Sequence, residues 1–412
     1  MDDKKNVSQF SSQPQPAERV IPAPLAPVFQ QPGQFRIAPV PAVRPRGTAS
    51  LASAPAPSLG PLAAFTGTFT GVGFNCIFRP NFGQTTFPNP VSPPPPAAPN
   101  DNVLEMNITS ETLSFSEQLG SVPNRGMVQD DIELNGVPYL QSISDITVPD
   151  QPIPIHLEPG LWVIVPATTD PQEGVTLARM ASIPHGTTIN AQGTFTTNSG
   201  SPLPLPTVDI TPFVAATGQK IPFPSMTASN GDTARIPQDL SSFTVGGTSA
   251  QDLISNPNAL LAAALETQTI LSTTTITIDT SPGTPLFGGG TDNIAFLLGD
   301  SKAAKPNAQG TRVQATFWIE TVQYTLPVPT WSPGDPPLVL TPQVPPGWTA
   351  PLPTFTGTPS QAITSPTTIR ATATQIQYSQ VVFLSFNGLT WPHASVNTLV
   401  PAAPIQLPPS AF

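Results

Sequence analysis

The sequence predicts an all-β protein, built as an antiparallel β-barrel with one short helix, long proline-rich loops and a disordered N-terminal arm. Three observations lead to this fold class. The 412 residues include 57 prolines and 29 glycines with abundant threonine, which favours strands and turns over helices. Strand-like runs recur along most of the chain after the arm. No period of 20 to 50 residues repeats, so a solenoid or a propeller is not supported, and one closed barrel accounts for the strands.

Charge and cysteine content exclude several classes of function. Charged residues make up only 10% of the chain, and the net charge of −10 leaves no basic stripe for nucleic acid or anionic lipid. Cys76 is the only cysteine, which excludes an intramolecular disulfide framework and a thiolate metal cluster; we expect it to be a buried strand residue. The sequence shows neither a signal-peptide core nor a membrane span, so we expect a cytoplasmic protein.

The first half of the chain reads as an arm followed by strands. Residues 1–60 are rich in Pro, Ala and Gln and predict the disordered arm. "AAFTGTFTGVGFNCIFRP" then predicts a sharply curved strand, because glycine inside a strand marks a bend or a close approach. Alternating runs predict strands over 101–120 and 130–146, with a tight turn at Asn135–Gly136. "LWVIVPAT" and "VTLARMASI" flank a turn-rich segment and predict an antiparallel hairpin.

The second half predicts one helix among strands and loops. Asn256 as a cap and Pro257 in the first turn predict a short helix within "SAQDLISNPNALLAAALETQTI". Strands are expected at 271–283, at 311–327 and, as one bent strand or two short ones, at 371–386. We therefore predict a single barrel domain over 61–412, with a large insertion at about 200–310 and a proline-rich crossing without regular structure at about 327–360.

Few residues point to chemistry. A Gly-x-Ser-x-Gly nucleophile elbow is absent, and the three histidines are too widely spaced for a zinc motif. His156 and Glu158 lie two residues apart on a predicted strand and would share one face. One metal cofactor, haem, needs only a single protein ligand.

Three segments, in order along the chain, resemble the nitrobindin-like members of the calycin barrels. "FTGTFTGVG" is similar to their opening Gly-x-Trp-x-Gly-x-Gly strand, with Phe69 at the tryptophan position. "NGVPYLQSISDITVPDQPIPIHLEPGLW" resembles their Tyr-x-Gln strand and the following His-x-Glu-x-Gly-aromatic strand. "FNGLTWPHASVNTLVP" is similar to their closing strand. The chain is more than twice as long as a minimal domain of this family.

The resemblance implies a calycin-like barrel that binds haem b. It implies that His393 is the proximal iron ligand and that His156 lies on the distal side, where His185 could supply a second polar group. The implied chemistry is on peroxide or reactive nitrogen species, in its specific form peroxynitrite isomerisation. We expect the pocket wall to come from Phe69, Trp162, Met180, Phe317 and Phe383.

Two alternatives remain open at the level of sequence. The barrel could lack iron and carry another lipophilic small molecule, which predicts an apolar interior. The proline-rich arm and the low charge also suit a structural or interaction protein that self-assembles as a homo-oligomer.

Overall fold

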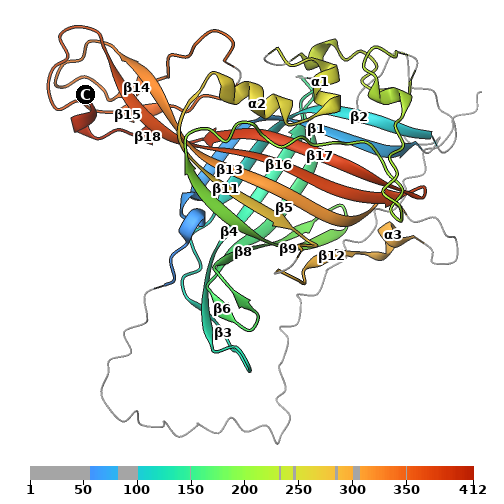
Figure 1. The fold of residues 1–412 in the computed structure, drawn as a ribbon. Helices are drawn as coiled ribbons and strands as arrows, with labels where there is room; N and C mark the ends of the chain where they lie inside the picture. The colour runs from blue at the N-terminus through green and yellow to red at the C-terminus, as the bar shows by residue number, and fades with distance from the viewer. Residues whose placement is uncertain are drawn as a thin grey trace, which may run out of the picture. The chain divides into compact units, whose positions relative to one another are not determined.

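Ten strands form a closed antiparallel barrel, as the sequence predicts (Figure 1). The computed structural model describes residues 56–81, 101–148, 150–231, 233–244, 247–283, 286–299, 307–348 and 350–412. The predicted N-terminal arm lies almost wholly outside these residues. The barrel strands are β1 (Gly67–Asn81), β2 (Asp101–Phe115), β4 (Ile132–Asp145), β5 (Ile153–Val165), β8 (Thr176–Ile183), β9 (Thr187–Ser199), β11 (Thr269–Asp279), β13 (Gln309–Val328), β16 (Thr367–Phe386) and β17 (Leu389–Pro401).

The strands follow one another around the barrel in chain order. Each pairs antiparallel with the next, and β1 closes the ring by pairing with both β2 and β17. The closing pair runs from Phe69 opposite Pro401 to Cys76 opposite Ala394. Gly71 permits the approach of these two strands, since a Cβ there would lie 1.9 Å from the carbonyl oxygen of Thr398. The glycine-rich first strand is thus required where the barrel closes.

Shorter elements decorate this barrel. The 3₁₀ helices are η1 (Gly60–Ala64), η2 (Pro224–Met226), η3 (Ser241–Phe243) and η4 (Pro409–Ala411), and the α-helices are α1 (Ala250–Ser255), α2 (Ala259–Glu266) and α3 (Ala295–Leu298). The minor strands are β3 (Val122–Asn124), β6 (Thr168–Thr169), β7 (Gln172–Glu173), β10 (Arg235–Ile236), β12 (Gly290–Asn293), β14 (Leu338–Leu340), β15 (Phe355–Gly357) and β18 (Ile405–Gln406). None of the helices in the described part of the chain is long and apolar enough to cross a membrane.

The helix η1 fills the end of the barrel at which β1 begins. Its Leu62, together with Phe65 just after it, is fully buried in an apolar cluster of inward-facing side chains. Phe65 stacks on Phe115 with ring centroids 4.5 Å apart, and it also contacts the ring of Trp162. We call this the closed end of the barrel.

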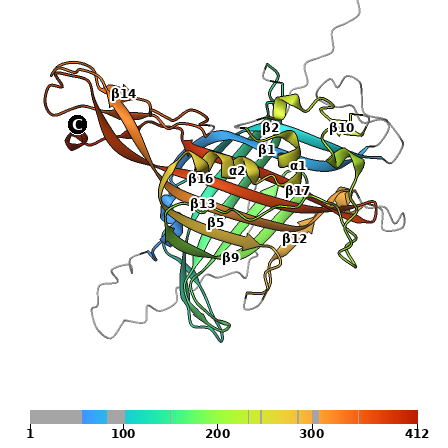
Figure 2. The same cartoon turned by 45° about the horizontal axis from the view of Figure 1, so that its top comes forward.

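In the second half of β1 and the first half of β2, the apolar face points outward rather than into the barrel. On β2, Leu104 and Met106 pack into an outer cluster, whereas Asn107 and Glu111 belong to the inward face. The outer cluster is covered by α1, α2 and the segment before them, which lie along the outside of these strands (Figure 2). Cys76 is buried in this cluster, as expected for a strand cysteine. The alternating residues of this part of β2 therefore lie on two covered faces, one inside the barrel and one under the outer cluster. Neither face is the solvated one that such a pattern usually indicates.

The predicted helix is two helices joined at Asn256. Ser249 caps α1 in a capping box with Asp252, and the Asn256 side chain instead accepts hydrogen bonds from the backbone N–H groups of Val208 and Asn258. Proline after Asn256 interrupts the run because it cannot continue the hydrogen-bond ladder of α1. The segment at 200–310, expected as an insertion, also contributes β11 to the barrel.

Two of the longest strands extend beyond the barrel. The last residues of β13 and the first of β16 pair with each other and carry a separate apolar cluster around Tyr324, Leu326 and Phe355. The proline-rich crossing was expected to lack regular structure, but it contains β14 and β15, which pair with each other, and β15 pairs with β18 (Figure 1). Short strands suffice there because their apolar side chains pack on the extended β13–β16 pair.

The tight turn expected at Asn135–Gly136 is wrong. Strand β4 runs through both residues, and Gly136 lies opposite Val163 of β5. The Asn135 side chain donates to Gln118 and to the carbonyl of Pro57, and accepts from the N–H of Gly120. The asparagine that signalled a turn thus holds neighbouring loops against the strand. The hairpin of β5 and β8 is present as predicted.

Candidate functional site

All three histidines gather at the end of the barrel opposite η1, which we call the histidine end. His393 lies near the start of β17, His156 near the start of β5, and His185 in the exposed turn between β8 and β9. The rings of His156 and His185 are stacked with centroids 5.7 Å apart. The two strands and the turn that carry the histidines are far apart in the sequence, and closure of the barrel brings them to the same end. The spacing of the histidines in the sequence therefore could not reveal this arrangement.

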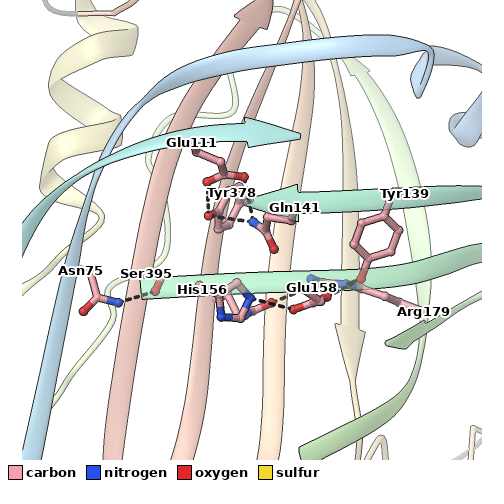
Figure 3. Close-up of polar contacts among 10 residues, drawn as sticks. Asn75, Glu111, Tyr139, Gln141, His156, Glu158, Arg179, Tyr378 and Ser395 are labelled. Atoms are coloured by element: carbon pink, nitrogen blue, oxygen red, sulfur yellow. Dashed lines mark hydrogen bonds and ion pairs between the residues drawn. The ribbon is translucent and has the colours of Figure 1, made fainter. Parts of the chain in front are cut away.

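His393 is on the inward face of the barrel. It shares that face with Ser395 and Asn397, and Val382 lies opposite it on β16. Its Nε2 lies 2.5 Å from Nδ2 of Asn75 on β1, and the same amide donates to the hydroxyl of Ser395 (Figure 3). An amide nitrogen is a donor, so Nε2 accepts and carries a lone pair.

The His393 imidazole is neutral. Burial, followed by the nearby positive charge of His156 and His185 when they are protonated, lowers the pKa of His393 to about 3. A neutral imidazole, which carries a lone pair on one ring nitrogen, is the form that binds a metal.

His156 is tied to a buried ion pair deeper in the barrel. Its Nε2 lies 3.2 Å from Glu158, whose other oxygen accepts from Arg179 at 2.5 Å and from the hydroxyl of Tyr139 (Figure 3). Burial alone would raise the pKa of Glu158, but the charge of Arg179 and the hydrogen bonds of His156 and Tyr139 lower it to about 2. Glu158 is therefore a fixed anion.

Arg179 separates the polar interior from the closed end. Its guanidinium donates to Tyr139, Glu158 and Gln380, and its Cζ lies 5.3 Å from the ring centre of Phe317 and 5.6 Å from that of Trp162. The ion pair is satisfied on the polar side, and the aromatic rings cover the other side.

A second buried carboxyl, Glu111, has no such cation. It accepts hydrogen bonds from Gln141 at 2.7 Å and Tyr378 at 2.6 Å (Figure 3). It also accepts one from Asn397 at 2.8 Å. Within the described chain no lysine or arginine forms an ion pair with it. Burial, only partly opposed by the bonds of Tyr378 and Gln141, raises the pKa of Glu111 to about 7.

The five predicted wall residues do not form one wall. Phe69, Trp162 and Phe317 face inward but belong to the apolar cluster of the closed end. Trp162 is six residues along β5 from His156, roughly 20 Å at the rise of an extended strand. Met180 faces outward and is 41% exposed, and Phe383 lies outside the barrel against Phe213 and Arg312.

Aliphatic side chains surround the histidines instead. Val382 faces His393 across the β16–β17 pair, and Ile143 faces His156 across the β4–β5 pair. Ile183 and Ile189, on either side of the turn that carries His185, are buried in the barrel interior. The histidine end thus combines one neutral imidazole with apolar walls.

Sequence reasoning missed most of the polar interior. Five polar residues occupy inward positions on strands that also carry apolar inward residues: Asn75, Glu111, Gln141, Arg179 and Tyr378. The alternation of polar and apolar residues along β2 carried a signal for this polar interior. The polar face of a strand usually faces solvent, however, so the alternation alone predicts that these polar side chains point outward.

No group of three or more His, Cys, Asp or Glu side chains in the described ranges is placed to hold a metal ion.

Comparisons with known proteins add only a distant structural likeness. No family model matches the chain, and no curated protein matches it. The chain is similar to a solved structure entitled "Crystal Structure of Rv2717c from M. tuberculosis", at 10% sequence identity and a TM-score of 0.33. The alignment covers 84% of this chain and 99% of the other. At this TM-score the likeness says nothing about function.

Proposed function

We propose that the barrel binds a small ligand at its histidine end and that the ligand is haem b, with His393 as the axial ligand of the iron. The observation that carries this proposal is the inward-facing, neutral imidazole of His393, whose Nε2 lone pair is held by the amide of Asn75. Haem requires one such ligand and an otherwise largely apolar wall.

The residues at the histidine end fit haem, but the wall differs from the one expected from the sequence. The donor fits, because a neutral imidazole at an inward position binds iron without first losing a proton. The wall is aliphatic, made of Ile143, Ile183, Ile189 and Val382, rather than the aromatic set expected from the sequence. Asn75 would give up its bond to Nε2 when iron binds, while its bond to Ser395 can remain.

The remaining histidines would define the opposite side of the ligand. His156, oriented by the fixed anion Glu158, can donate or accept a hydrogen bond there, and His185 stacks against it. When bound, haem would supply an iron with a position open to small oxidants. Reactivity toward peroxide or reactive nitrogen species rests on the resemblance of three segments to the nitrobindin-like barrels.

Absorption spectroscopy tests this proposal. The protein purified with haem supplied is expected to show a Soret band that is lost or strongly shifted in His393→Ala. Met180→Ala, on the outer surface, is the control and should leave the band unchanged. Absence of a Soret band in the wild type, or an identical band in His393→Ala, would overturn the proposal.

A further inference from the structure

The centre of the barrel holds hydrogen-bond acceptors that no group of the described chain satisfies. Gln141 and Asn397 each donate an amide hydrogen to Glu111, yet their amide oxygens, Oε1 and Oδ1, are buried without a hydrogen-bond partner in that part of the molecule. Both residues are at most 4% exposed. Buried polar atoms in native proteins are nearly always hydrogen-bonded, so each unsatisfied one indicates a missing partner.

The orientation of these amides is set by Glu111. A carboxylate accepts only, so Gln141 and Asn397 must turn their nitrogens toward it and their oxygens away. In Figure 3 the oxygen of Gln141 points away from Glu111, toward the level of His156 and Glu158. Gln141 and Glu158 lie opposite each other on β4 and β5, one inward position deeper than His156. The oxygen of Gln141 therefore lies on the side of Glu111 that faces the histidine end.

One charged group here also lacks an ion-pair partner among the described residues. Arg179 is paired with Glu158, whereas Glu111 accepts from three donors and pairs with no described lysine or arginine. Three neighbouring groups thus offer acceptor oxygens, and one of these groups, Glu111, is ionisable.

We propose that the space between Glu111 and His156 binds the protonated amine of a small organic cation, with Glu111, Gln141 and Asn397 as its acceptors. An alkylammonium has three donors and one positive charge, which match two amide oxygens and one carboxylate. Its three acceptors are distinct from the iron ligand proposed at His393, and binding of the cation does not require haem.

Calorimetry or ligand-observed NMR of the full, haem-free chain with n-butylammonium chloride tests the proposal. An alkylammonium keeps its proton throughout the range used, as lysine does with a pKa of about 10.4. Saturable binding is expected, with 1-butanol, its uncharged counterpart, binding at least tenfold more weakly. Butanol binding as well as the cation would overturn the proposal, as would no binding of either.

Affinity should also increase at least tenfold between pH 5.5 and pH 8.5, because ionised Glu111 binds the cation and the protonated form does not. The titratable and charged groups that also act on Glu111 are Arg179 on β8, His156 on β5 and Tyr378 on β16. Glu111→Gln isolates the carboxylate: its affinity should fall at least tenfold at pH 8.5. Glu320→Gln is the matched control, since Glu320 is equally buried but lies on the outward face of β13.

Equal affinity in Glu111→Gln and wild type would overturn the proposal. A pH-independent wild-type affinity would do so even if the variant failed to fold. The Soret test at His393 can succeed or fail independently of either result.

Discussion

The amide of Asn75 lies 2.5 Å from Nε2 of His393, and this contact joins the two strands that close the barrel. The two residues are 318 positions apart in the sequence. The amide donates, so it stabilises the uncharged imidazole and fixes the direction of the ring.

Replacing Asn75 by aspartate should raise the pKa of His393 from about 3 toward or above its ordinary value of 6.5. A carboxylate beside the ring favours the imidazolium, whereas the amide favours the neutral form. NMR titration of the histidine ring protons measures this change. Ser395→Ala removes the other partner of Asn75 and should change the His393 pKa much less. An unchanged His393 pKa in Asn75→Asp would show that the amide does not control the ring.

His393 should make the fold sensitive to acid. Its pKa is lower in the folded chain than the value of 6.5 expected on unfolding, so the unfolded state binds the extra proton. The stabilisation is present above pH 6.5 and is lost progressively as the pH falls toward 3, by at most about 1.4 kcal/mol per pH unit. Urea unfolding at pH 7, 6 and 5 should show a shallower decline for His393→Gln than for the wild type.

Glu111 should act in the opposite direction. Its pKa is raised from 4.5 to about 7 in the folded protein, so the unfolded state releases the proton first and folding loses free energy as the pH rises through this interval. Glu111→Gln removes this loss and should gain stability relative to the wild type between pH 4.5 and pH 7. A difference that does not change with pH would contradict the assigned direction.

The ion pair of Glu158 and Arg179 should be far more important for stability than an exposed pair. Glu158→Gln leaves a buried guanidinium without its counter-ion, which typically costs about 3–5 kcal/mol. Asp131→Asn breaks the solvent-exposed pair with Arg125 and should have a much smaller effect, because solvent screens an exposed pair. Chemical denaturation of both variants at pH 7 provides the comparison. Equal effects would mean that the interior is more hydrated than its burial suggests.

Leu62 should anchor the closed end. It is fully buried under η1, so Leu62→Ala is expected to lower the free energy of unfolding by about 2–5 kcal/mol. Leu140→Ala, at a position 45% exposed on the outside of β4, should cost less than about 0.5 kcal/mol. Thermal unfolding distinguishes the two, and similar shifts would indicate that η1 does not seal the barrel.

The sequence predicted the barrel because its strand signals are local. Alternation on β13 placed Phe317 and Ile319 on one face and Trp318 and Tyr324 on the other, and the structure confirms this division. The turn at Asn135–Gly136 was wrong because tertiary contacts of the Asn135 side chain outweigh the local turn preference.

The site was harder to predict, since its residues are brought together only by closure of the ring. The resemblance implied that His393 is a ligand, but the sequence left open whether its side chain points into the barrel or to solvent, and it did not predict the aliphatic residues around it. Met180 and Phe383 fail as wall residues because each is one position out of phase with the inward face of its strand. The polar partners of Glu111 come from three other strands, and no local pattern links them.

The pairing of β1 with β17 also has a consequence for the order of assembly. During synthesis β1 emerges more than 300 residues before β17, so Asn75 must wait for nearly the whole barrel before it meets His393. Contacts this distant in sequence are formed late and slowly. The two proposed ligand sites therefore cannot form on a partial chain, and a ligand that binds at either would select only molecules whose last strand is already in place.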